Sequence, residues 1–139
     1  SAPLFLGIMQ ELWRICRHEA EIEITVPHPR HDYFLWDPTH VRPITWEGLD
    51  CFNQDKNRQR IASGAANTPL GLQLGIDFRI TKVAHTLDEY WRQRLAGGEM
   101  SNAEVEFHAR HYNNVVAETQ INLVAIKAPP SQGSNAAPA

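Results

Sequence analysis

The feature that most constrains the fold is the alternation of apolar and polar residues over positions 103–127. Read as two strands joined at 112–114, this stretch has one apolar face and one charged or amide face. A three-residue loop sets Phe107 opposite Thr119 and makes the two apolar faces coincide, whereas a two-residue loop does not. The alternation therefore predicts a β-hairpin with strands at 103–112 and 115–126.

A helix is the rival interpretation of the same stretch. In a helix, Glu104, His108 and His111 share one face, beside a heptad-like apolar stripe that continues to Ile126. The two interpretations place the histidines differently, because residues three apart share a helix face but lie on opposite faces of a strand.

The first 26 residues carry the clearest local signals. Positions 3–18 repeat apolar residues at helical spacing, with Pro3 in the first turn, and predict an amphipathic helix. Positions 20–26 alternate apolar residues with Glu and Thr, which predicts a half-buried strand that ends at Pro27. The stripe of the predicted helix consists of Leu4, Phe5, Ile8, Met9, Leu12, Trp13 and Cys16.

The middle of the chain is less regular. Positions 27–43 contain four prolines, and we expect only a short strand there, at positions 34–36. Thr45 is expected to cap a helix that runs to about residue 60, and positions 63–69 form a turn or loop.

A second long strand is predicted over positions 70–83, where leucines and other apolar residues alternate with polar residues or glycine. Such a long run is expected to bend or bulge near one of its glycines. Thr86 and Glu89 have the spacing of a capping box, so we expect a short helix that stops at Gly97 and Gly98.

This order of elements predicts an α+β fold, an antiparallel sheet with peripheral helices. A β-sandwich or jelly roll with short helices is the alternative, if the proline-rich middle contributes further strands. We expect a single globular domain at 1–128. Positions 129–139, PPSQGSNAAPA, form a low-complexity tail whose composition could not build a core.

Composition excludes several classes of function. The apolar fraction of 42% and the charged fraction of 21% are those of an ordinary soluble protein. A net charge of -3 is too balanced for a protein that binds nucleic acid by neutralising phosphates. No apolar run is long enough to cross a membrane and no signal-like segment begins the sequence, so we expect an intracellular protein or one within a particle assembled in the cytoplasm. Cys16 and Cys51 lack metal-knuckle spacing and are expected to be buried thiols.

Histidines are the main candidates for chemistry. His28 and His31, followed by Asp32, could supply two imidazoles and a carboxylate to zinc or iron if their loop were tight. His108 and His111 have the same spacing but point to opposite faces in the hairpin interpretation, where His108 lies opposite Glu118. An HxxH pair without an embedded glutamate is a weak metal signal, and hydrogen-bonded histidines are the simpler interpretation of both pairs.

No motif for nucleophilic catalysis or nucleotide binding occurs in the sequence. The leading expectation is therefore a non-enzymatic structural subunit, such as a capsid-stabilising or other accessory protein. It would bind a protein partner or copies of itself, and neither nucleic acid nor membrane, without a cofactor. A metal-dependent enzyme and a small-ligand binding module are the alternatives. The expected interface residues are Leu4, Phe5, Ile8, Trp13, Trp36, Pro129 and Pro130.

Overall fold

The protein is built on one open, three-stranded antiparallel sheet with strand order β1-β3-β2. A computed structural model describes residues 2–128 of the chain. The elements of this part are α1 (Ala2–Ile15), β1 (Glu21–Pro27), α2 (Asp32–Trp36), α3 (Trp46–Leu49), the 3-10 helix η1 (Asp50–Phe52), α4 (Gln54–Ser63), α5 (Leu70–Leu74), β2 (Phe78–Leu87), α6 (Glu89–Ala96), α7 (Asn102–His111) and β3 (Val116–Ala125).

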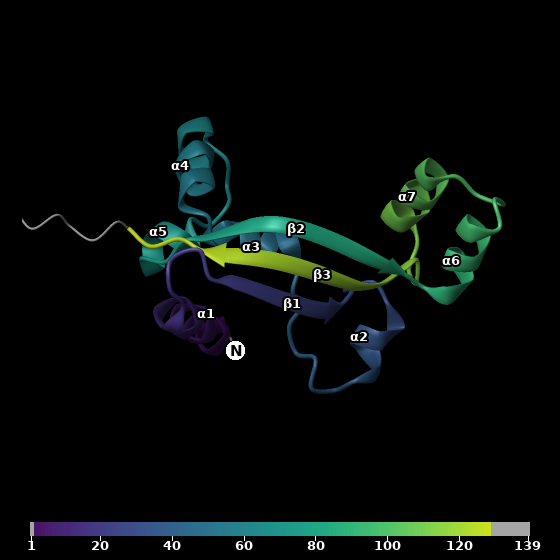
Figure 1. Ribbon diagram of the computed structural model, residues 1–139, viewed down its shortest axis with the longest axis horizontal. Helices are drawn as coiled ribbons and strands as arrows, with labels where there is room; N and C mark the ends of the chain where they lie inside the picture. Colours follow the sequence, from purple (N-terminus) through teal and green to yellow (C-terminus); the bar gives the residue numbers. More distant parts are fainter. Residues whose placement is uncertain (1, 129–139) are drawn as a thin grey trace, which may run out of the picture.

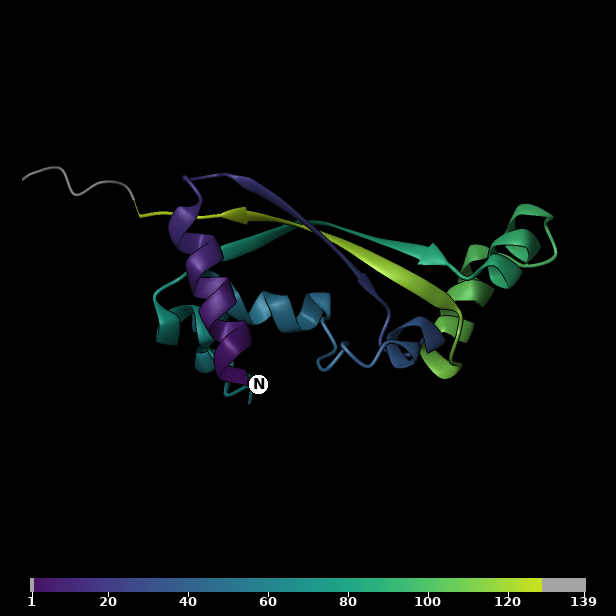
Figure 2. The same cartoon turned by 90° about the horizontal axis from the view of Figure 1, so that it is seen from below.

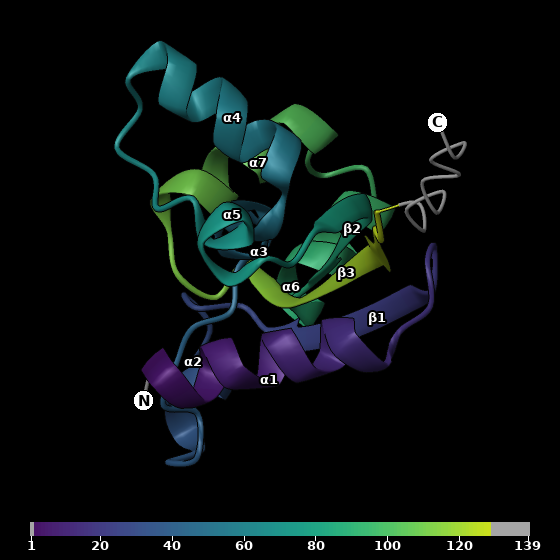
Figure 3. The same cartoon turned by 90° about the vertical axis from the view of Figure 1, so that its left-hand side faces the viewer.

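The helices gather at the two ends of the long sheet. Helices α1, α3, α4 and α5 lie at one end, and α2, α6 and α7 lie at the other (Figure 1). Seen from below, the sheet runs along the upper side of the molecule with α1, α3 and α2 beneath it (Figure 2). Helix α1 lies next to the β1 edge of the sheet, and α4 lies on the opposite side (Figure 3).

This architecture confirms the predicted α+β class, the N-terminal helix and the strand that follows it. The sheet is open and single, so the sandwich alternative is wrong for the described part of the chain. Thr45 does cap a helix, since its hydroxyl accepts the Gly48 N–H. That helix ends after one turn, however, and Asn53 caps a new helix, α4.

The predicted hairpin is half wrong, because residues 102–111 form the helix α7. The cause is local. The Ser101 hydroxyl accepts the Glu104 N–H, and the Glu104 carboxylate accepts the Ser101 N–H, which is a complete capping box. Asn114, with φ of 60°, then turns the chain into β3, so the rival helical interpretation holds only up to His111.

The predicted strand at 70–83 is also wrong over its first half. Residues 70–74 form the short helix α5, which Gly75 ends in the left-handed conformation at φ 67°, and β2 begins only at Phe78. The expected capping box at Thr86 does not form either, because the Asp88 side chain caps α6 instead. The short strand expected at 34–36 is helical, within α2.

The core lies under one half of the sheet. Ile121 of β3 pairs with Ile24 of β1 and Val83 of β2, and Leu123 pairs in the same way with Ile22 and Ile80. Buried side chains of α1, α3, η1 and the segment before β2 pack against these rows. The core cluster is Met9, Leu49, Phe52, Ile76, Phe78, Ile121, Leu123 and Ala125.

Candidate interaction surface

Helix α1 presents apolar side chains to solvent as well as to the core. Met9 is buried, and Trp13 ties the helix to the sheet because its Nε1 donates to the carbonyls of Asp77 and Ile126, each at 3.1 Å. On another face of the same helix, Leu4 is 65% exposed and Ile15 is 63% exposed. Ile8 lies between them and is also exposed. This second apolar stripe has no partner within the described chain.

Helix α2 carries the most exposed aromatic residue of the described chain. Trp36 and Leu35 are each 71% exposed, and the Tyr33 ring packs edge-on against the Trp36 indole at 5.5 Å. The helix itself is held firmly, because the Asp32 N–H donates to the Asn114 side chain at 2.8 Å. The indole is therefore presented to solvent on a helix that is held in place.

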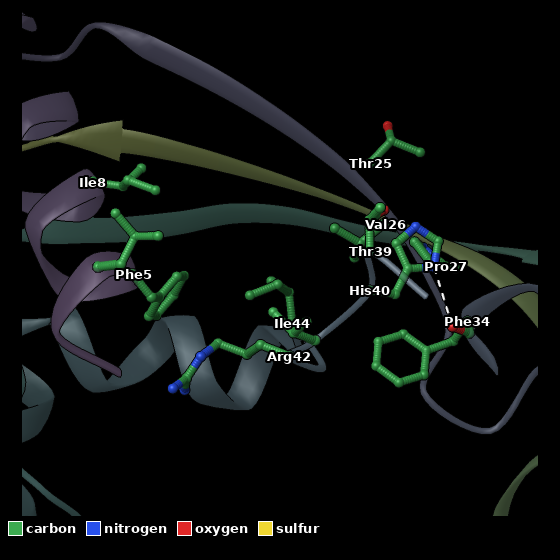
Figure 4. A pocket seen from close by; sticks show the side chains of 12 residues that line it. Phe5, Ile8, Thr25, Val26, Pro27, Phe34, Thr39, His40, Arg42 and Ile44 are labelled. Atoms are coloured by element: carbon green, nitrogen blue, oxygen red, sulfur yellow. Dashed lines mark hydrogen bonds between the residues drawn. The ribbon is translucent and has the colours of Figure 1, made fainter. Parts of the chain in front are cut away.

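An apolar groove of about 370 Å³ lies between these two helices. Phe5 and Ile8 form its wall on α1, Val26 of β1 lies above it, and Phe34 closes it on the α2 side (Figure 4). His40 donates its Nδ1 proton to the Phe34 carbonyl at 3.1 Å and so fixes the loop behind the groove. Val41, on the same loop, is 81% exposed.

The strand that borders this groove is an edge strand. β1 pairs only with β3 among the described elements. The His28 N–H donates to Ala117 and the Ala125 N–H donates to Ala20, so backbone bonds flank the strand at both ends. Because such bonds alternate along an antiparallel ladder, Glu21, Glu23 and Thr25 direct their backbone groups away from the sheet.

We call this whole region the β1-edge surface. It combines two exposed helix faces, an apolar groove and a free strand edge. Among its exposed apolar side chains, Leu4, Ile8 and Val41 line the groove, and Ile15, Leu35 and Trp36 lie on the two helices outside the groove lining.

The predicted interface residues fall on this surface to different degrees. Leu4, Ile8 and Trp36 are exposed on it, and Phe5 lines its groove half-buried. Trp13 is engaged within the chain by its hydrogen bonds to the backbone. Pro129 and Pro130 lie outside the described residues.

The structure does not gather His28, His31 and Asp32 into a set of metal ligands. Both nitrogens of the buried His31 are engaged: Nδ1 accepts the Tyr33 N–H at 3.1 Å, so Nε2 carries the proton and donates to Asp88 at 3.0 Å. This bond links α2 to α6. Within residues 2–128, no group of three His, Cys, Asp or Glu side chains is placed to hold a metal ion.

His108 is not opposite Glu118, because it lies on α7 and not on a strand. Its ring packs against Trp91 of α6 at 5.0 Å and stacks on Tyr112 at 5.3 Å. The histidine therefore helps to join α6 to α7. Both cysteines are half-buried and neither forms a disulfide, so the expectation of two buried free thiols is met only in part.

A second groove, of about 580 Å³, has a polar floor. Beyond the apolar rows of the sheet, β3 and β2 place Thr119 opposite His85, whose Nδ1 lies 3.0 Å from the threonine hydroxyl. His28 also lines this groove, and burial lowers the pKa of its imidazole, with smaller contributions from nearby His85 and Arg30. Sequence reasoning missed this site, since its residues meet only through the strand register.

Comparisons with protein-family models, with curated proteins and with solved structures found no match to this chain. None of the helices among residues 2–128 has the length and apolar character needed to cross a membrane.

Proposed function

We propose that this protein is a non-enzymatic subunit that binds another protein chain through the β1-edge surface and so stabilises a larger assembly. The observation that carries the proposal is the exposure of Trp36 and Leu35 on a helix that is itself held in place. Single exposed apolar residues are ordinary on protein surfaces, but several large ones on the two helices that border an apolar groove are typical of interfaces.

The chemistry of the surface supports protein binding. Large aromatic and aliphatic side chains that become buried on association supply most of the binding free energy at interfaces. The rest of the groove agrees with this role, because its wall residues are mostly apolar, and His40 and the charged Arg42 lie in the loop at its rim. Arg42 places its guanidinium over the Phe5 ring at 5.1 Å, an arrangement that keeps the charge at the surface.

Site-specific photo-crosslinking tests the proposal. A photoreactive benzoylphenylalanine would replace Trp36 in one variant and Ile61, which is 57% exposed on the distant helix α4, in a matched control. Irradiation in extracts of the native host should give a discrete protein adduct from position 36 and none from position 61. Equal labelling at both positions, or none at position 36, would contradict the proposed surface.

A second candidate function is small-ligand binding in the polar-floored groove. Its volume of about 580 Å³ lies within the range of small-molecule sites. Native mass spectrometry of the protein as purified would report any bound metal or small molecule as a fixed mass excess on each chain. Such an excess, lost on substituting His28 and His85, would favour this candidate or the metal-dependent enzyme over the assembly subunit.

A further inference from the structure

The two exposed apolar faces of the β1-edge surface lie at opposite ends of one strand. α1 precedes the N-terminal end of β1, and α2 follows its C-terminal end. The free edge of β1 lies between the two helices (Figure 2). A partner must therefore present something apolar at each end of this edge, and a strand between them.

A second copy of the chain meets this requirement, because antiparallel pairing of the two β1 strands places the opposite ends of the two copies side by side. When two identical strands pair antiparallel, the N-terminal end of each lies beside the C-terminal end of the other. Pairing β1 with β1 of a second copy would then bring the apolar face of α1 toward α2 of the partner copy, and the reverse. Such a contact is self-complementary, as a two-fold interface requires.

The residues of β1 also select one register for this pairing. Glu21, Glu23 and Thr25 direct their backbone groups outward, so these residues must make the new ladder. A two-fold axis at Ile24 sets Glu23 opposite Thr25 of the second copy and Glu21 opposite Pro27. An axis at Glu23 would instead set two carboxylates directly opposite each other, which destabilises a strand pair. An axis at Thr25 would set Glu21 opposite Pro29, beyond the end of β1, and so would shorten the ladder.

Pro27 is compatible with the first register and costs it one hydrogen bond, at the outermost rung. Pro27 has no N–H to donate, but its carbonyl can still accept from Glu21 of the second copy at the outer rung. In that position the missing donor falls at the end of the ladder, where the pairing stops in any case.

We propose that the partner of the β1-edge surface is a second copy of this chain, joined by antiparallel pairing of the two β1 strands about Ile24 into one continuous six-stranded sheet. The inference rests on the proposed function. In the dimer, Leu35 and Trp36 of each copy pack toward Leu4 and Ile8 of the other.

Sedimentation velocity and native mass spectrometry of the purified full chain test the dimer. The expected mass is twice the 15.8 kDa of one chain. A chain that stays monomeric up to about 100 µM would overturn the inference, since an interface of standard size is saturated well below that concentration.

Two substitutions at Thr25 test the contact between the β1 strands. Thr25→Pro removes an outward N–H from the middle of the proposed ladder and should give a folded monomer, whereas Thr25→Ser keeps the N–H and should remain a dimer. A Thr25→Pro protein with an unchanged circular dichroism spectrum that still dimerises would overturn the pairing.

The helix contact is tested independently of any change in the strand. Leu35→Ser together with Trp36→Ser alters only exposed side chains and should raise the dimer dissociation constant about tenfold or more. Ile61→Ser, at an exposed apolar position on α4, should leave the constant unchanged. Equal effects of the two changes would count against the proposed surface.

Photo-crosslinking separates failure of the second copy from failure of the surface itself. In the purified dimer, a crosslinker at position 36 should join to peptides of α1 from the other chain. If the purified chain is a monomer and position 36 instead captures a protein of another mass in host extracts, the second copy is wrong and the interaction surface stands. If position 36 gives no adduct in either sample, both proposals fail.

Discussion

Gly71 shows how one residue fixes the packing between α5 and the helices before it. A Cβ atom at this position would lie 2.6 Å from the Phe52 carbonyl oxygen and 2.9 Å from Asn57 Oδ1. Neither atom can give way easily, because one is backbone and the buried Asn57 side chain also accepts the Leu72 N–H. Glycine is therefore required here by close approach and not by a positive φ.

We predict that Gly71→Ala lowers the free energy of unfolding by about 1–3 kcal/mol, because the added methyl overpacks this contact. Gly7→Ala is the matched control, since Gly7 lies in α1 with no atom within 4 Å of a Cβ. Alanine there should raise the free energy of unfolding by about 0.5–1 kcal/mol through helix propensity. Urea denaturation of both variants measures the two effects, and a neutral Gly71→Ala would show that α5 can move.

His28 makes the stability depend on pH. Burial is the main cause that lowers its pKa in the folded protein below the ordinary value of 6.5, and nearby His85 and Arg30 add to the effect. Protonation therefore favours the unfolded chain. The stabilising contribution is complete above the pKa of the unfolded state and is lost as pH falls through the lower pKa of the folded state.

We predict that His28→Asn flattens the dependence of unfolding free energy on pH between about pH 7.5 and about pH 5. Denaturant titrations of the wild-type chain and the variant across this range provide the measurement. If both proteins lose the same stability on acidification, other groups control the acid response and the imidazole of His28 does not.

At the scale of elements, the hydrogen bonds of a helix cap decide between helix and strand at 102–111 more strongly than the alternation of apolar and polar residues does. The sequence from 103 to 111 alternates like a strand, but Ser101 and Glu104 close both hydrogen bonds of a capping box and the chain becomes α7. Only Val105 of this helix is buried, and its other tertiary packing is limited to half-buried side chains such as His108 beside Trp91. The hydrogen bonds of the cap are accordingly a large part of what stabilises this segment as a helix.

Ser101→Ala should lower the unfolding free energy by about 1 kcal/mol, because the Glu104 N–H at the start of α7 loses the hydroxyl oxygen that accepts its hydrogen bond. Ser101→Asp retains an acceptor and is the matched control. Backbone chemical shifts of residues 102–111 would show whether the loss is local to the helix. An alanine variant with unchanged shifts and stability would contradict the role given to the cap.

The competition between periodic sequence pattern and local backbone interactions also explains which elements could be predicted from the sequence. α1 and β1 have long periodic patterns bounded by prolines, and both were predicted correctly. The segment at 70–74 alternates leucines with smaller residues, yet a left-handed Gly75 and the contact at Gly71 make it a short helix. Periodicity over so few residues does not separate a strand from a helix turn.

The candidate surface was predictable only in part for a related reason. Trp36 was expected at an interface because it is apolar among prolines and charges, and the structure leaves it exposed. The bond between His31 and Asp88 joins residues 57 positions apart and depends on how α2 and α6 meet. No local pattern in the sequence encodes such a pairing, nor the polar groove formed where β2 and β3 bring His85 to Thr119.

For the whole molecule, the important asymmetry is between the two ends of the sheet. The core cluster belongs to the end that carries α1 and η1. The end that carries α6 and α7 lies outside this cluster, and polar contacts help to hold it beside the packing of Trp91 against His108. The Arg30 guanidinium donates to the Arg110 carbonyl at 2.7 Å, and the His31 imidazole donates to Asp88 at 3.0 Å. α6 buries no residue at all.

We therefore predict that α6 and α7 open in a local unfolding step at a lower free energy than the global transition that exposes β3. In native-state hydrogen exchange, amides of 89–96 and 102–111 should exchange well before those of 116–125. Gly71→Ala offers a control from the opposite end. It should lower the protection of the β3 amides, which exchange through global unfolding, and leave the opening of α6 and α7 unchanged, because distant sites act independently. Equal protection of both ends, or an equal response to Gly71→Ala, would mean that the sheet transmits stability along its whole length and that the molecule unfolds as one unit.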